Sequence, residues 1–368
     1  MYKLFVEQKN ISTKISKINE FKYKFFILAN SKVIDELILR GTPREIGLQH
    51  GKRLASDIKV VLNHYLSLWT FPAEEIPQRV LGFKKSIERE FPHLGEEIRG
   101  IAEGSGIPED LVYAINARTE LLGDASLIEC TAIGISKFSK AGGHVVLGQN
   151  WDWVNYFREL TKVVDIQPHD RPRMKMLIEP GMVGKIGMNE TGVGVCLNFL
   201  KTPQIKNDGI PVHVMLRGIL ETTSYASALG MVSTLPRAAS ANYLVGSRDA
   251  EDYSYEIGSL ETTPDTIKVL KDPSFITHTN SFNADGEVCP RQEKFKQALR
   301  NYMHSNPERK ISPEDLKRAF KIPGVEFPST SNPGGIETIH TVIMNLSKGR
   351  FLVSRGAQSE EFSLYQFG

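Results

Sequence analysis

The pattern of the sequence changes at Cys130-Thr131-Ala132-Ile133-Gly134-Ile135-Ser136. Before this point apolar residues recur at three- and four-residue steps, which is typical of amphipathic helices, as in Leu54, Ile58, Val61, Leu62, Tyr65 and Trp69. After it, short β-rich runs are separated by Gly, Asn and Pro. The sequence therefore predicts a helical N-terminal third and a β-rich remainder that begins close to Cys130.

Helix and strand signals refine this division. Thr42-Pro43-Arg44-Glu45 offers an N-cap, a proline and an acidic residue for a first helix, and further helices are expected to end near Gly104-Ser105-Gly106 and to begin at Pro108. Strands are expected at residues 132–136, 145–148, 163–166, 174–178, 185–188, 193–198, 243–246, 253–257, 267–271 and 275–279, with helices at 212–222, 225–234, 292–304 and from 312, and a closing hairpin of 340–346 and 350–354. Strands without regular βαβ alternation predict an α+β fold with antiparallel sheets.

Charge and hydropathy exclude several classes of protein. Lys plus Arg is 45 and Asp plus Glu is 43, so nothing predicts nucleic-acid binding. The apolar run Phe25-Phe26-Ile27-Leu28-Ala29 is too short for a signal peptide, and no run approaches the roughly 18 apolar residues of a membrane span. A protein without a membrane segment, located in the cytoplasm, is the expectation.

The cysteines and histidines favour a free thiol over a disulfide or a metal site. The three cysteines form no C-x-x-C pair, and the nine histidines include no H-E-x-x-H motif and no close His/Cys cluster. Cys196 lies inside an apolar run and reads as a core residue, whereas Cys289 reads as a loop thiol. Cys130 stands at the junction between the helical and the β-rich parts, and Gly148-Gln149-Asn150-Trp151-Asp152-Trp153 follows twenty residues later, so it is the candidate nucleophile.

The chain resembles the isopenicillin-N acyltransferase (acyl-coenzyme A:6-aminopenicillanic acid acyltransferase) family of N-terminal-nucleophile hydrolases. The resemblance extends from about residue 38 to the C-terminus. Its motifs occur in the order of the family and comprise residues 39–47 with His50-Gly51, 97–102, 116–120, Cys130-Thr131, 148–152, Glu179 with Gly181, 184–187 and 278–280.

This resemblance implies an αββα sandwich of antiparallel sheets and synthesis as an inactive precursor. Carried over position by position, the Glu129–Cys130 bond is the cleavage site and Cys130 is the nucleophile. Asp152 aligns with the acid near the nucleophile's amine, and Asn280 aligns with the amide of the oxyanion hole. The implied parts are a leader of residues 1–37, a helical α-fragment of 38–129 and a catalytic β-fragment of 130–368, which remain one integrated domain after cleavage.

The chemistry requires these residue types. A thiol with a pKa of about 8.5 is only partly ionised at neutral pH, and a free α-amine with a pKa of about 7.7–8.0 can accept its proton. Residues expected to support the site or contact substrate are Arg118, Glu120, Thr131, Asn150, Trp151 and His278. Arg118 and Glu120 are read first as part of a structural ion pair, and His278 first as a structural residue.

The expected function is a self-processing cysteine amidohydrolase that cleaves a linear amide, such as an N-acyl amino acid, a small peptide or an acyl amine. One alternative is an acyltransferase, for which a coenzyme A thioester would serve only as acyl donor, since no cofactor is expected. Another is a papain-like protease using Cys130 with His278 or His340. A third, of a different class, is an unprocessed, non-catalytic binding protein, favoured by Glu129 where the fungal penicillin enzyme has glycine.

Overall fold

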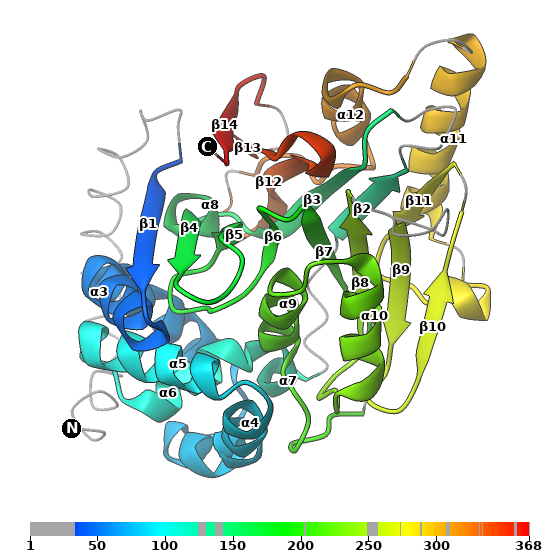
Figure 1. Ribbon diagram of the computed structural model, residues 1–368. Coiled ribbons are helices and arrows are strands. Elements are labelled where there is room, and N and C mark those ends of the chain that lie inside the picture. Colours follow the sequence, from blue (N-terminus) through cyan, green and yellow to red (C-terminus); the bar gives the residue numbers. More distant parts are fainter. Residues whose placement is uncertain are drawn as a thin grey trace.

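The computed structural model describes residues 34–123, 130–136, 143–201, 204–248, 257–272, 274–287, 289–306, 310–330, 332, 334–356 and 359–367. Within them two sheets pack face to face (Figure 1). The first has the order β1 (Glu36–Gly41), β4 (Lys162–Pro168), β5 (Met174–Ile178), β6 (Ile186–Asn189), β7 (Val193–Phe199), β8 (Ala241–Ser247), β9 (Ile257–Thr262) and β10 (Ile267–Leu270). The second has the order β11 (Phe275–His278), β2 (Cys130–Ile135), β3 (Val146–Val154), β12 (Ile336–Asn345), β13 (Arg350–Arg355) and β14 (Phe362–Gln366).

Helices cover the outer face of each sheet. The described helices are α3 (Pro43–Leu68), α4 (Ile76–Glu90), α5 (Pro92–Ser105), α6 (Glu109–Asn116), α7 (Arg118–Leu122), α8 (Phe157–Leu160), α9 (Val212–Leu220), α10 (Tyr225–Thr234), α11 (Pro290–Ser305) and α12 (Pro313–Phe320). Helix α9 packs on β6 and β7 and α10 on β8, whereas α11 and α12 pack on the second sheet. The predicted α+β fold and αββα layer order are therefore confirmed.

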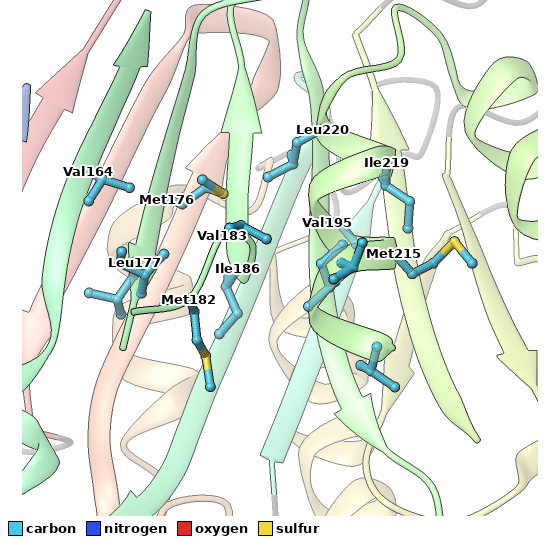
Figure 2. Close-up of a cluster of buried hydrophobic side chains, with 14 of the residues drawn as sticks. Val164, Met176, Leu177, Met182, Val183, Ile186, Val195, Met215, Ile219 and Leu220 are labelled. Carbon is cyan, nitrogen blue, oxygen red and sulfur yellow. The ribbon is translucent and has the colours of Figure 1, made fainter. Parts of the chain in front are cut away.

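The first sheet is buried on both faces. Figure 2 shows Met215 and Ile219 of α9 beside Val195 of β7, in the cluster that also contains Met176 and Ile186. The second sheet likewise has a core on each side, because Ala132 of β2 belongs to the core between the sheets while its neighbour Ile133 packs under α11 and α12. Burial on both faces explains why these strands read as apolar runs rather than as alternating patterns.

The predicted start of the first long helix is confirmed. Thr42 and Glu45 form a capping box at the beginning of α3. Two strands, β14 and β1, were not predicted, however. Strand β1 buries Leu37 and Leu39, exposes Arg40, and pairs in parallel with β4. Strand β1 is a six-residue edge strand that directly precedes the strong helix signal at Thr42. That signal obscures the alternation of buried and exposed residues in β1. Residues 36 and 37 of the expected leader belong to β1.

Helices α3 and α5 cross through glycines. A Cβ atom on Gly47 or Gly51 of α3 would lie 2.0 Å from the Glu97 carbonyl oxygen or 2.4 Å from the Ile101 carbonyl oxygen, respectively. A Cβ atom on Gly100 of α5 would lie 2.4 Å from a carbonyl oxygen of α3. The two helix backbones are in direct contact, so the glycines are required by packing.

Replacing Gly51 by alanine is expected to lower the free energy of unfolding by about 1–3 kcal/mol or more, because the methyl group overlaps the α5 backbone. The matched control is Gly230→Ala in α10, where nothing lies within 4 Å of the added Cβ. That change is expected to raise stability by about 0.5–1 kcal/mol. Urea titrations of both variants at one protein concentration measure the difference, and equal effects would contradict the proposed close crossing.

Candidate active site

Cys130 is the first residue of β2 and lies opposite Trp151 of β3. Its backbone N–H donates a hydrogen bond to Asn280 Oδ1 at 2.7 Å. Its carbonyl oxygen accepts from Asn198 Nδ2 and from the Arg291 guanidinium, each at 3.2 Å. The side chain is only 4% exposed. The candidate nucleophile is thus held at both of its backbone polar groups.

Arg291, in the first turn of α11, connects the expected site residues. Its guanidinium donates to Asp152 Oδ2 at 3.0 Å and to Asn280 Oδ1 at 3.1 Å, besides the carbonyl of Cys130. Asp152 is fully buried and its other oxygen accepts from Thr338 Oγ1 at 2.5 Å. The structure therefore brings Cys130, Asp152 and Asn280 together around one arginine that the sequence analysis did not identify.

Asn198 of β7 is a second residue that the sequence analysis missed. Besides the Cys130 carbonyl, its amide contacts the His278 carbonyl at 3.4 Å, while its oxygen accepts from Asn242 at 3.1 Å. Ser259 in turn donates to Asn242 at 2.6 Å. This chain of buried polar side chains crosses the first sheet toward the start of β2. The signal that could have revealed Asn198 is that β7, β8 and β9 each bury a polar residue, because buried polar groups need hydrogen-bond partners.

The thiolate form of Cys130 is disfavoured in its buried position. Burial, followed by the nearby Asp152 charge, raises the pKa of Cys130 to about 11. A hydrogen bond from the Asp152 backbone amide and the charges of Lys185 and Arg291 act in the opposite direction. A base close to the sulfur is therefore needed for nucleophilic attack at neutral pH.

Beside the thiol lies a small cavity of about 20 Å³, enough for about one water molecule. Cys130, Trp151, Arg118 and Lys185 all line it. Glu179 accepts hydrogen bonds from Lys185 Nζ at 2.9 Å and from Arg118 Nη2 at 2.7 Å. Arg118 therefore forms an ion pair with Glu179 of the β-rich part, and not with Glu120, with which the sequence analysis grouped it.

Electrostatics tie these three charges to one another. Burial lowers the pKa of Lys185 to about 8, against the attraction of Glu179. Burial raises the pKa of Glu179, but the charges of Arg118 and Lys185 outweigh this effect and hold the pKa well below its usual range. The Lys185 ammonium also lies 3.9 Å from the centroid of the Trp151 ring, a cation–π contact. Trp151 thus contributes to the cavity wall, consistent with its expected supporting place.

Other expected residues lie away from the thiol. Asn150 accepts from Thr341 Oγ1 at 2.7 Å and donates to the Phe320 carbonyl at 3.0 Å, and Thr131 Oγ1 donates to the Val325 carbonyl at 3.5 Å. Both side chains contact the region of α12, on the face of the sheet opposite to the cavity. Glu129, the expected residue before the cleaved bond, lies outside the described residues.

His278 is a buried structural residue in its described contacts. Its ring nitrogens lie 2.8 Å from Glu261 Oε1 and 2.6 Å from the Thr279 carbonyl oxygen. His340 is held similarly, 2.6 Å from Thr161 Oγ1 and 2.8 Å from the Ser354 carbonyl oxygen. Both nitrogens of each imidazole are thus engaged elsewhere, which argues against a papain-like pair with Cys130.

A larger cavity of about 570 Å³ lies against α7, whose first residues line the cavity beside Cys130. Its wall includes the apolar side chains of Phe71, Phe83, Leu121 and Ile205 together with polar residues such as Arg79 and Asn207. Glu120 also lines it: one carboxylate oxygen accepts from the Val212 N–H at 2.8 Å, and Oε2 has no hydrogen-bond partner in the described residues. Burial raises the pKa of Glu120 to about 7.

Glu120 makes stability depend on pH in a predictable direction. Its folded pKa of about 7 lies above its reference value of 4.5, so the folded state binds the proton more tightly. The contribution of Glu120 to stability is therefore fully present below pH 4.5 and is lost as the pH rises through about 7. Glu120→Gln removes this loss and should stabilise the protein at pH 8 by up to roughly 3 kcal/mol, with little effect near pH 4.5.

Urea titrations at pH 5 and pH 8 measure this effect. The exposed Glu74→Gln is the matched control, for which only a small change in the free energy of unfolding is expected. A Glu120→Gln effect of equal size at both pH values would contradict the buried, proton-binding carboxyl.

Two features are absent from the described residues. None of them forms a group of three or more His, Cys, Asp and Glu side chains placed to bind a metal ion. No helix among them combines the length and apolarity needed to cross a membrane.

Comparison with known proteins now places the chain. The sequence model of the family described as acyl-coenzyme A:6-aminopenicillanic acid acyl-transferase matches residues 139–356. The chain is 31% identical over 249 residues to the acyl-coenzyme A:6-aminopenicillanic-acid-acyltransferase 40 kDa form of Emericella nidulans, which covers 66% of this chain and 67% of the relative.

Solved structures of similar shape include a Caenorhabditis elegans N-acylethanolamine-hydrolyzing acid amidase ortholog, with 17% identity, a TM-score of 0.46, and coverage of 65% of this chain and 100% of that chain. Another is penicillin V acylase from Agrobacterium tumefaciens, with 11% identity, a TM-score of 0.44, and coverage of 65% and 86%. The family match spans more than half of the sequence and includes Asp152, Asn280 and Arg291. The predicted membership is confirmed, and the chain belongs to the acyl-coenzyme A:6-aminopenicillanic acid acyl-transferase family.

Proposed function

We propose that this protein is a self-processing amidohydrolase that cleaves a linear amide through a thioester at Cys130. The observation that carries the proposal is the fixed position of the Cys130 nitrogen, 2.7 Å from Asn280 Oδ1 and joined through Arg291 to the buried carboxylate of Asp152. A polar, anchored environment suits an α-amine that must hold and release a proton. Family membership supports chemistry at a carbon–nitrogen bond.

The first step is the cleavage of the chain itself. The Cys130 sulfur attacks the carbonyl carbon of Glu129, the carbon–nitrogen bond breaks, and the thiol proton goes to the departing nitrogen. Water then hydrolyses the thioester, which leaves a carboxylate on Glu129 and restores the thiol. The product has a free α-amine at Cys130. This amine is the base that the buried thiol, with its raised pKa, needs in order to lose its proton at neutral pH.

Turnover of substrate repeats this chemistry on an external amide. The α-amine takes the thiol proton, the sulfur attacks the substrate carbonyl, and the proton passes to the leaving amine. Asn280 is proposed to donate to the oxyanion through its amide group, whose nitrogen now donates to the Phe199 carbonyl at 2.9 Å. Asp152 is proposed to act on the α-ammonium electrostatically, with Arg291 between the carboxylate and the backbone of Cys130.

Water is proposed as the group that resolves the thioester, because hydrolysis needs no acceptor pocket. Acyl transfer to an amine is the second candidate, favoured by the name of the Emericella nidulans relative. In that case a thioester such as an acyl-coenzyme A would be a substrate that donates its acyl group. Neither route needs a bound cofactor.

The two fragments are proposed to stay associated as one domain. Strand β1, from the part before Glu129, supplies an edge of the eight-stranded sheet by pairing with β4. Buried ion pairs also join the parts, Arg118 with Glu179 and Arg217 with Glu97. The proposed partners are therefore the two fragments of the chain and a small amide or peptide substrate.

Intact-mass measurement under denaturing conditions tests self-processing. The wild-type chain is expected to give two fragments, one ending at Glu129 and one beginning at Cys130. Cys130→Ala should remain a single species of 41.2 kDa, because it lacks the attacking sulfur. Cys289→Ser is the matched control, since it removes a partly exposed thiol at the start of α11 and should be processed normally. An uncut wild-type chain after days at neutral pH would contradict self-processing.

Arg291→Gln is expected to slow formation of the acyl-enzyme about 100-fold, because the backbone of Cys130 and the Asp152 carboxylate lose their common partner. The rate can be followed by the release of p-nitrophenol from p-nitrophenyl phenylacetate with the processed protein. Arg318→Gln, whose side chain is 68% exposed, is the control and should react at the wild-type rate. A wild-type rate in Arg291→Gln would remove Arg291 from the mechanism.

A further inference from the structure

The cavity of about 570 Å³ against α7 is separate from the cavity beside Cys130. The first two residues of α7 line the smaller cavity and the last three line the larger one, and the two linings share no residue. A volume of several hundred Å³ is typical of sites for small organic molecules, whereas the smaller cavity has room for about one water molecule. The larger cavity can therefore hold a ligand that the smaller one cannot.

The larger cavity extends from exposed residues to a buried carboxyl group. Phe83 in its lining is 1% exposed and Glu120 is 4% exposed. The exposed residues in the lining, which mark the open side, are Leu68, Thr70, Arg79, Gly123 and Asn207. A ligand that enters from the open side would place its body against the apolar side chains and one polar group at Glu120.

The carboxyl group of Glu120 can accept further hydrogen bonds. A carboxylate has about four acceptor positions. Glu120 accepts from the Val212 N–H at 2.8 Å, and its own backbone amide also favours the charged form. Its Oε2 is covered and has no partner among the residues that the structure describes. The terminal torsion of a glutamate is soft, so a small rotation can turn this oxygen towards a donor in the cavity. A ligand with a donor would remove the cost of the unpaired oxygen.

The charges around Glu120 favour an uncharged ligand. Two cations, Arg118 and Lys185, share the carboxylate of Glu179. The charge of Arg118 also acts on Glu120, so ionisation of Glu120 brings this group to two positive and two negative charges. An ammonium ligand would leave an excess cation in a buried region, and a carboxylate ligand would be repelled by Glu120. A hydroxyl group supplies a donor without adding a charge.

The titratable groups on neighbouring elements leave Glu120 as the main site of charge change just below pH 8. On α9, burial holds the pKa of His213 well below its usual range, which keeps it neutral. On β8, burial raises the pKa of Tyr243, so its phenol stays protonated. On α4, Arg79 is exposed and is held in an ion pair at 2.7 Å. Lys185 has a pKa of about 8, whereas that of Glu120 is about 7.

We infer that the cavity against α7 is a ligand site for an uncharged, apolar molecule that donates a hydroxyl hydrogen bond to Glu120. Phenols and apolar alcohols belong to this class, and the rings of Phe71 and Phe83 in the wall suit the flat body of a phenol. This inference goes beyond the proposed function, because it requires no reaction at Cys130.

Isothermal titration calorimetry with 4-propylphenol and its methyl ether, 4-propylanisole, tests the inference on the full chain of the wild type and of Cys130→Ala. The two probes share their ring and propyl group, but only the phenol can donate a hydrogen bond. At pH 7.5 the phenol is expected to bind at least about tenfold more tightly, because hydrogen bonds to charged groups are the stronger ones. The ether is the more apolar probe, so equal or tighter binding of the ether would overturn the inference.

The pH dependence and a variant identify the acceptor. Affinity for the phenol should rise at least about fivefold from pH 6 to pH 7.5 as Glu120 ionises, whereas affinity for the ether should not. Glu120→Gln should lose this rise and most of the preference for the phenol, and the exposed Glu74→Gln should keep both. A preference that persists unchanged in Glu120→Gln would overturn the inference. Tighter binding of the cation 3-phenylpropylamine, or no binding of the phenol up to its solubility limit, would also overturn it.

The comparison of the two probes and its pH dependence stand even where Glu120→Gln does not fold. Failure of the proposed function is distinguishable, because neither probe contains an amide and Cys130→Ala lacks the sulfur needed for a thioester. Self-processing and acyl-enzyme formation have their own readouts.

Discussion

The guanidinium of Arg291 is the constraint on which the site depends. It binds Asp152 in β3, Asn280 after β11 and the carbonyl of Cys130 in β2, so one side chain fixes three adjacent segments of the second sheet. Its charge is balanced by Asp152 in a region where the carboxylate is fully buried. A charge-assisted contact of this kind is strong and directional. The position of Cys130 therefore follows from the helix start at Pro290 as much as from strand β2.

Much of the fold could be predicted from the sequence, because the signals for its helices and strands lie within short segments of the chain. Three such signals each involve only a few neighbouring residues. They are the capping box at Thr42, the glycine that ends α5 at Gly106, and the change of pattern at Cys130. The resemblance to a family then placed Asp152 and Asn280 near Cys130, and the described contacts are consistent with that placement.

The features that were missed depend on contacts far apart in the chain. Nothing near Arg291 indicates that it reaches Asp152, 139 residues away, and nothing near Arg118 indicates Glu179 as its partner. Asn198 reads as one polar residue in a strand until Asn242 and Ser259 are found behind it. Burial of charge and polarity is decided by the assembled layers, so single-sequence patterns cannot reveal it.

The parallel pairing of β1 with β4 has a consequence for the way the protein comes apart. Glu36–Gly41 lies before the proposed cut and Lys162–Pro168 lies after it. The cut therefore breaks the covalent connection between two strands that are already paired in one sheet. Loss of the native state then also separates two molecules, and its midpoint temperature becomes a function of protein concentration. Dilution, which leaves an intact single chain unaffected, would act on the cut form as a denaturant.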